Sequence, residues 1–208
     1  MTFNHPLLDK LQKYDFILGS TSPRRQEILR NNLGISKFRV IGSKFAEDLS
    51  KDDKTPLEYV QLTSKHKAEH ILADLYIGQS PTIILTCDTI ISCNDKVFEK
   101  PITQENQRNF FEYFGKHPEI DVISALTAIK VENGTTEEFT DYSISKLTFK
   151  NDKDLINAYI SSNEGLEVAG GFKYQELGCL LFSSMDGDYL NIVGLPLKTF
   201  ELLNKVVS

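Results

Sequence analysis

A short segment near the N-terminus places two arginines where a helix is expected to begin. The segment reads Leu18-Gly19-Ser20-Thr21-Ser22-Pro23-Arg24-Arg25. Ser22 suits the N-cap and Pro23 the first helical position. The arginines then fall beside unpaired N–H groups and the positive end of the helix dipole, where cations are unfavourable. A bound anion would reverse that sign, which favours a phosphate site. An ordinary capped helix with solvent-facing arginines is the alternative.

Carboxylates in two places could hold a metal ion or activate water. Asp88 lies inside the apolar run Ile83 to Ile91, where a charge is costly unless it is paired, metal-bound or at a cleft. Glu47 and Asp48 lie in a predicted loop and mean little alone. Together with Asp88 they could bind Mg²⁺, which takes a carboxylate or two plus phosphate oxygens and water. A strand residue pointing to solvent is the other interpretation of Asp88.

Further polar side chains could complete a site, although each signal is weak. Lys65 and Lys67 flank the apolar stripe of one predicted helix, and periodicity does not decide which points inward. Lys100 precedes Pro101, which restricts its backbone. Gln175 follows a Gly-Gly turn and is expected to begin a strand, where it could orient water or contact a base.

The elements that must position these residues alternate between helices and hairpin-linked strands. A capping box, Thr55 with Glu58, opens one helix, and Asn133-Gly134 predicts a hairpin. Expected helices cover 5–13, 23–32, 55–75, 103–116, 152–160 and 191–207, and expected strands 16–18, 82–92, 96–98, 121–131, 137–149 and 174–185. This pattern predicts an α/β fold with a mixed, mostly antiparallel central sheet flanked by helices.

Composition limits the class of partner. The chain has 208 residues and a formal net charge of -6, so one domain spanning 1–208 is expected and long nucleic acid is an unlikely ligand. The three cysteines form no Cys-x-x-Cys pair, which argues against zinc and redox motifs. No apolar run is long enough for a membrane helix and no secretory signal is visible, so a cytoplasmic protein with no membrane partner is expected.

Several blocks, taken in order, resemble the Maf family of nucleoside triphosphate pyrophosphatases. The resemblance runs from about Phe16 to Leu203. Its most specific blocks are the first and the last, and order and spacing support the middle ones. The blocks are Ser20 to Arg25, Phe45 to Leu49, Glu58 to Val60 with Lys67-Ala68, Cys87-Asp88-Thr89, Glu99-Lys100-Pro101, Ala169-Gly170-Gly171 with Gln175, and Gly187 to Leu197.

The resemblance implies a fold, an activity and a cofactor. The fold would have two lobes around a cleft, similar to inosine triphosphate pyrophosphatases. The activity would be metal-dependent cleavage between the α- and β-phosphates of a nucleoside triphosphate, usually a pyrimidine nucleotide (dTTP, UTP, CTP) or a modified nucleotide. The cofactor would be Mg²⁺ or another divalent cation such as Mn²⁺, and a homodimer is implied.

The resemblance also assigns roles to individual residues. Carried over by motif, Asp88 and Glu47 would bind the metal, with Asp88 activating the attacking water. Lys67 and Lys100 would neutralise phosphate charge, and Gln175 would orient water or nucleotide. The residues expected to contact substrate are Ser20, Ser22, Arg24, Arg25 and Thr89.

Three other functions remain open from the sequence. One is a purine-directed pyrophosphatase acting on ITP or XTP. Another is a nucleotide-binding regulator of cell division without turnover, which is motivated by departures from the family pattern at Val168 and Glu176. The third is an unrelated α/β interaction module. Glu99, before Lys100-Pro101, also departs from the usual small residue.

Overall fold

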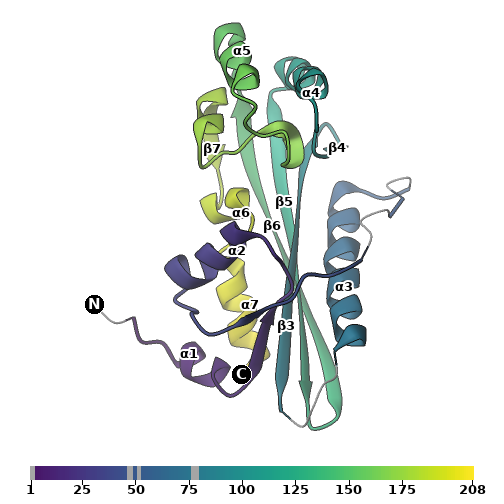
Figure 1. Ribbon diagram of the computed structural model, residues 1–208, viewed down its shortest axis with the longest axis vertical. Helices are drawn as coiled ribbons and strands as arrows, with labels where there is room; N and C mark the ends of the chain where they lie inside the picture. Colours follow the sequence, from purple (N-terminus) through teal and green to yellow (C-terminus); the bar gives the residue numbers. More distant parts are fainter. Residues whose placement is uncertain (1–2, 46–48, 51–52, 76–79) are drawn as a thin grey trace.

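A single seven-stranded sheet runs through the part of the chain that the computed structural model describes, residues 3–45, 49–50, 53–75 and 80–208 (Figure 1). Its order is β2-β1-β3-β5-β6-β7, with β4 paired to β3. The strands are β1 (Asp15–Leu18), β2 (Arg39–Val40), β3 (Thr82–Cys93), β4 (Lys96–Phe98), β5 (Glu119–Glu132), β6 (Thr135–Phe149) and β7 (Phe182–Asp186).

Parallel and antiparallel pairings share this sheet. β1 pairs in parallel with β2 and β3, whereas β3, β5, β6 and β7 form an antiparallel series. β5 and β6 are joined at Asn133-Gly134, where both residues have positive φ. The expected mixed, mostly antiparallel sheet is confirmed.

One edge of β3 is divided between two short strands. β1 pairs with Thr82 to Leu85, and β4 pairs with Ile91 to Cys93. Between them, residues 86–90 have no strand on that side within the described chain, while β5 pairs along the other side throughout. Asp88 lies in this interval, so the split in the sheet allows its side chain to reach a cleft.

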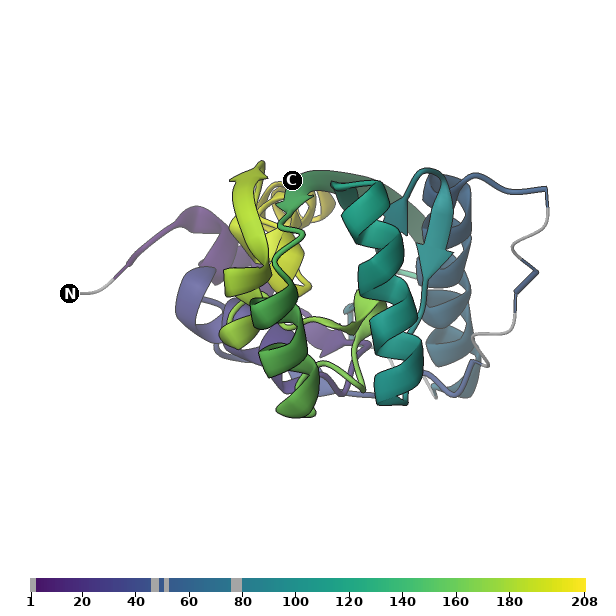
Figure 2. The same cartoon turned by 90° about the horizontal axis from the view of Figure 1, so that it is seen from above.

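The helices gather at both ends and on both faces of the sheet (Figure 1). α3 packs on β3 and β5, and α7 packs against β5 and β6. Figure 2 shows α4 and α5 side by side at the upper end. The helices are α1 (Pro6–Leu11), α2 (Pro23–Glu27) with a π-helical continuation (Ile28–Asn32), α3 (Pro56–Asp74), α4 (Gln104–Lys116), α5 (Lys153–Ser161), α6 (Tyr189–Val193) and α7 (Lys198–Val206).

Separate clusters of buried apolar side chains hold the helices at the two ends of the sheet. One cluster joins α1, the π-helical continuation of α2, and α7 to β1 and β3, through side chains such as Leu29, Leu85 and Leu203. Another joins α4, α5 and β7 at the upper end, around Phe111, Phe149 and Phe182. Burial of such side chains is the main stabilising term. The two ends are therefore built on different cores that share the long strands.

Local capping signals predict the helix starts well. The Thr55 side chain accepts from Glu58 N–H, and the Glu58 carboxylate accepts from Thr55 N–H, which completes the expected capping box. Thr103 and Asp152 cap α4 and α5. Ser22 occupies the N-cap of α2 and Pro23 its first position, as expected, although the Ser22 side chain makes no capping hydrogen bond to a described residue.

The strand expected over 174–185 is confirmed only from Phe182 onward, and the closing helix expected over 191–207 has its regular part only after Pro196. Residues 174–176 form a turn, Leu177–Leu181 is a 3₁₀ helix, and only Phe182–Asp186 is strand. The closing segment is two helices, α6 and α7, separated at Gly194 to Leu197. Gly194 has φ +123° and Pro196 lacks an N–H, so a continuous helix cannot form there. In the described residues, no helix has the length and apolarity to span a bilayer.

Candidate functional site

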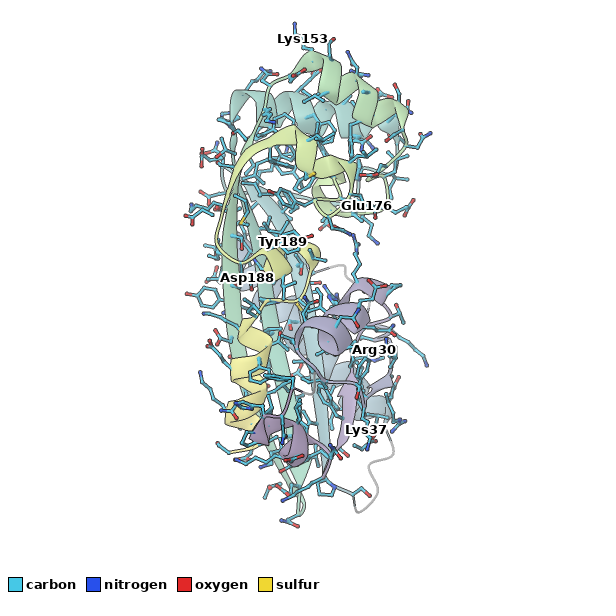
Figure 3. The ribbon with its side chains drawn as sticks, turned by 90° about the vertical axis from the view of Figure 1, so that its left-hand side faces the viewer. Arg30, Lys37, Lys153, Glu176, Asp188 and Tyr189 are labelled. Atoms are coloured by element: carbon cyan, nitrogen blue, oxygen red, sulfur yellow. The ribbon has the colours of Figure 1, made fainter. Side chains whose placement is uncertain are left out.

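The split in the sheet opens into a polar pocket between α2 and α6 on one side and the segment 167–175 on the other. The sticks in Figure 3 show the two ends facing each other, with Glu176 on the upper one and Arg30 on the lower one. The pocket has a volume of about 260 Å³, and its lining includes Ser22, Arg24, Arg25, Lys67, Asp88, Thr89, Lys100 and Gln175. Eight of the sequence-predicted site residues therefore meet here.

A buried ion pair lies at the floor of this pocket. Lys67 Nζ donates to Asp88 Oδ1 at 2.7 Å, and each side chain is about one-tenth exposed. Burying either charge alone would be costly, and the pairing offsets that cost. Lys65, by contrast, lies on the surface and pairs with Glu138 at 3.0 Å. The structure thus resolves which lysine of α3 faces inward.

Arg25 connects three separate segments around the pocket. Its Nε donates to the Gly194 carbonyl at 2.9 Å, Nη1 to Ser20 Oγ at 3.2 Å, and Nη2 to Thr89 Oγ1 at 3.4 Å. Thr89 in turn shares a 2.8 Å hydrogen bond with Ser124. These bonds join the start of α2 to β3 and to the turn after α6. Arg25 therefore links the segments of this wall. Ser20, which was expected to contact substrate, is buried and is not among the residues that line the pocket.

Arg24 is the arginine that remains available to a ligand. It lines the pocket and is half-buried, and its guanidinium makes no hydrogen bond or ion pair with the described residues. Its position in the first turn of α2 matches the expected anion-binding placement. The two arginines, equivalent in the sequence motif, thus have different surroundings.

Lys100 and Gln175 approach the pocket from the upper end. Lys100 is exposed and follows β4. Gln175 is half-buried and lies in the turn before the 3₁₀ helix, not in a strand as expected. Gly170 and Gly171, at φ +71° and +78°, shape the backbone that leads to it, and Gly170 N–H donates to the Glu99 carbonyl at 3.1 Å.

Comparison with known proteins decides the family. Residues 15–206 match the Maf-like protein family. The chain belongs to the Maf family. A dTTP/UTP pyrophosphatase from Saccharomyces cerevisiae is 41% identical over 91% of this chain and 89% of the relative. A dTTP/UTP pyrophosphatase from Clostridium novyi is 34% identical over 87% of this chain and 91% of the relative.

Two further comparisons involve a longer relative of this Maf chain and a solved structure. A probable bifunctional dTTP/UTP pyrophosphatase/methyltransferase protein from Homo sapiens is 34% identical, over 94% of this chain and 32% of that protein. A HAM1 protein structure from Coxiella burnetii is 12% identical, with a TM-score of 0.44 over 79% of this chain and 89% of that one. That score is too low to support an argument.

The donor set of this Maf chain is compatible with a divalent cation shared with substrate. Within the described residues, no group of three or more His, Cys, Asp or Glu side chains could hold a metal. Mg²⁺ needs no such cage, because it binds through one or two carboxylates plus phosphate oxygens and water. Asp88 supplies a pocket carboxylate whose Oδ2 makes no hydrogen bond to a described residue. Glu47, the other predicted ligand, and Asp48 lie outside the described residues.

Sequence reasoning missed several pocket residues of this Maf chain. Glu167, Tyr174 and Gly194 received no role, although all three line the pocket. For Gly194 a sequence signal was available: Pro196 follows two residues later, so a helix is expected to end near Gly194 and to leave its carbonyl without a partner inside the helix. Burial raises the pKa of Tyr174, whose ring packs against Phe182 and Tyr189. No sequence signal identifies Glu167 or Tyr174.

Proposed function

We propose that this Maf chain hydrolyses pyrimidine nucleoside triphosphates, dTTP and UTP above all, to the monophosphate and pyrophosphate. One observation carries the proposal. A buried carboxylate, Asp88, lies with Lys67 in a pocket that is also lined by Arg24 and Lys100. Such a site offers three cations to a phosphate chain and one carboxylate to water or metal. The relatives named dTTP/UTP pyrophosphatase supply the base preference.

The reaction needs alignment and charge stabilisation more than covalent chemistry. Water attacks the α-phosphorus, the bond to the oxygen bridging the α- and β-phosphates breaks, and pyrophosphate leaves. Asp88 accepts the proton of the attacking water, and Lys67, 2.7 Å from it, neutralises charge on the phosphate chain. Arg24 and Lys100 bind the phosphates, and Gln175 orients the water or the nucleotide. We infer these roles from the positions of the side chains in the pocket and from the chemistry that each side chain can perform.

A divalent cation, Mg²⁺ or Mn²⁺, fits this proposal. Asp88 and Glu47 would hold it, and it would neutralise negative charge on the phosphate oxygens. Removing divalent ions with a chelator should abolish pyrophosphate release, and adding Mg²⁺ or Mn²⁺ should restore it. Full activity after chelation would exclude a metal requirement.

A substrate panel tests the activity. The purified protein is incubated with Mg²⁺ and, separately, dTTP, UTP, CTP, ITP or XTP, and both pyrophosphate and monophosphate are measured. We expect equal amounts of the two products and the fastest release from dTTP or UTP. Release from ITP or XTP alone would replace the pyrimidine assignment by the purine alternative. Binding without turnover on any substrate would favour a regulatory role.

Assembly and location complete the proposal. We expect a cytoplasmic homodimer, and light scattering after size-exclusion chromatography measures the mass. The outer face of β6 exposes Tyr142 and Ile144, which a second copy could cover. Free thiols at Cys87, Cys93 and Cys179 are compatible with a reducing compartment. A monomer at micromolar concentration would contradict the first expectation, and secretion of the tagged chain the second.

A further inference from the structure

A buried glutamine on α4, outside the pocket, forms hydrogen bonds to the segment that forms the pocket's upper wall. Gln107 is fully buried, and its Nε2 donates to two backbone carbonyls, Glu164 O and Gly171 O, each at 2.7 Å. Residues 167–169, which line the pocket, lie between these two carbonyls in the chain. One side-chain amide therefore closes the base of the loop that contributes this wall.

The chemistry of the two neighbours fixes the direction of the amide. Both partners are carbonyl oxygens, so only the NH₂ group can face them, and its two hydrogens are both used. Gln107 Oε1 is buried and has no hydrogen-bond partner in the described chain. Leaving a buried acceptor unpaired costs free energy. The amide nevertheless keeps this orientation, which indicates that its two hydrogen bonds to the carbonyls outweigh the free-energy cost of the unpaired Oε1.

The segment that Gln107 holds is also closely packed around Gly171. A Cβ added there would lie 3.2 Å from both Gln107 Cγ and Pro101 Cγ, so α4 packs closely against this backbone. Two residues on, Lys173 N–H donates to Tyr159 Oη at 2.9 Å, which anchors the same segment to α5. Gln107 and Tyr159 thus fix the backbone on both sides of Phe172, directly before Tyr174 and Gln175.

We propose that Gln107 is a positioning residue for substrate binding: it holds the 164–171 loop so that Val168, Ala169 and the following Gln175 form the pocket wall opposite Arg24. The proposal rests on the proposed function, because the substrate meant is a nucleoside triphosphate. Gln107 is not among the residues that line the pocket, and its side-chain hydrogen bonds within the described chain go to backbone carbonyls. Only the fraction of molecules with the loop in place binds substrate well, so loosening the loop raises the apparent KM.

The same helix provides a matched control. Gln104 also uses its Nε2 twice, donating to Ile160 O at 3.0 Å and to Asn163 Oδ1 at 2.9 Å. Those partners belong to the end of α5 and the turn after it, which do not line the pocket. Gln104→Met therefore removes the same number of hydrogen bonds from the same helix without releasing the pocket wall.

The experiment compares Gln107→Met with Gln104→Met in the full chain. For Gln107→Met we expect the KM for UTP to rise by up to about fivefold, the limit set by losing about 1 kcal/mol of loop-holding interaction. A merely structural role would lower the folded fraction, and hence the apparent kcat, at unchanged KM. Gln104→Met should leave KM unchanged. An unchanged KM in Gln107→Met, or an equal rise in both variants, would overturn the inference.

Two further measurements keep the test independent of folding and of the proposed activity. Tyr159→Phe removes the second anchor with little change in volume and should also raise KM, so it carries the test if Gln107→Met does not fold. Amide hydrogen exchange of residues 165–173 should be about fivefold faster in Gln107→Met than in Gln104→Met. Equal exchange would overturn the inference even if the wild type hydrolysed no nucleotide, a result that would overturn the proposed function separately.

Discussion

Lys67 Nζ and Asp88 Oδ1 lie 2.7 Å apart, on α3 and β3, which pack against each other. The pair joins the long helix to residues 86–90 of β3, which have no neighbouring strand on the pocket side within the described part of the chain. It therefore has two consequences. The ion pair offsets the free-energy cost of burying the carboxylate, and it presents a cation and an anion together at the pocket floor.

Asp88→Asn should nearly abolish turnover. The amide cannot accept the proton of water and is a poorer metal ligand, so we expect kcat to fall about 10²-fold or more. Lys67 also loses its buried counter-charge, so the melting temperature should fall as well. Asp95→Asn is the control, because Asp95 is exposed in the β3–β4 turn at φ +59°, a conformation that asparagine tolerates. Near-normal turnover of Asp88→Asn would exclude Asp88 as base or essential ligand.

The two lysines of α3 give a test of burial. Lys67→Met leaves Asp88 buried without its cation, and breaking a buried pair costs about 3 kcal/mol or more of the free energy of unfolding. Lys65→Met removes an exposed pair with Glu138 and should change stability and kinetics little. Chemical denaturation and UTP kinetics on both variants measure the difference. Equal effects of the two substitutions would argue against the buried pair as the anchor of the site.

Which of these lysines faces inward could not be predicted from the sequence. Both flank the apolar stripe of α3, and the choice depends on which strand lies beneath the helix, a tertiary relationship. The capping box of Thr55 and Glu58 could be predicted, because it is local. The strand expected at 174–185 was wrong over residues 174–181 for a similar reason. At Gly178 the chain folds back so closely that a Cβ would lie 2.5 Å from the Lys173 carbonyl oxygen, and no hydrophobic pattern reports that contact.

The two neighbouring arginines should behave differently when replaced. Arg24→Ala removes a cation that makes no bond to the described residues, so stability should hold while the KM for UTP rises about tenfold from the loss of a charge-assisted contact. Arg25→Ala breaks the links to Ser20, Thr89 and Gly194, so the melting temperature should fall too. Thermal unfolding separates the cases. An unchanged KM in Arg24→Ala would remove Arg24 from the phosphate site.

Arg25→Lys tests whether charge alone suffices at the second position. Lysine keeps the cation but lacks the planar fork that reaches three partners in different directions. We expect this variant to resemble Arg25→Ala in thermal unfolding and to show reduced activity. Wild-type stability of Arg25→Lys would mean that the three hydrogen bonds of Arg25 contribute little and that its charge is what the site requires.

Alanine substitutions at two glycines with similar φ angles distinguish backbone strain from steric crowding beside the pocket. Gly134→Ala, at φ +77° with no atom of the described residues within 4 Å of the added Cβ, should cost only the left-handed strain, about 1 kcal/mol. Gly170→Ala, at φ +71°, bears the same strain and places its Cβ 2.7 Å from Ile91 Cγ1. Either the Ile91 side chain, which lines the pocket, or the Gly170 backbone, whose N–H donates to the Glu99 carbonyl, must shift. We therefore expect Gly170→Ala to lose more stability than Gly134→Ala and, unlike it, to raise the KM for UTP. If both variants kept the wild-type KM, close packing of this turn would not be needed to shape the pocket.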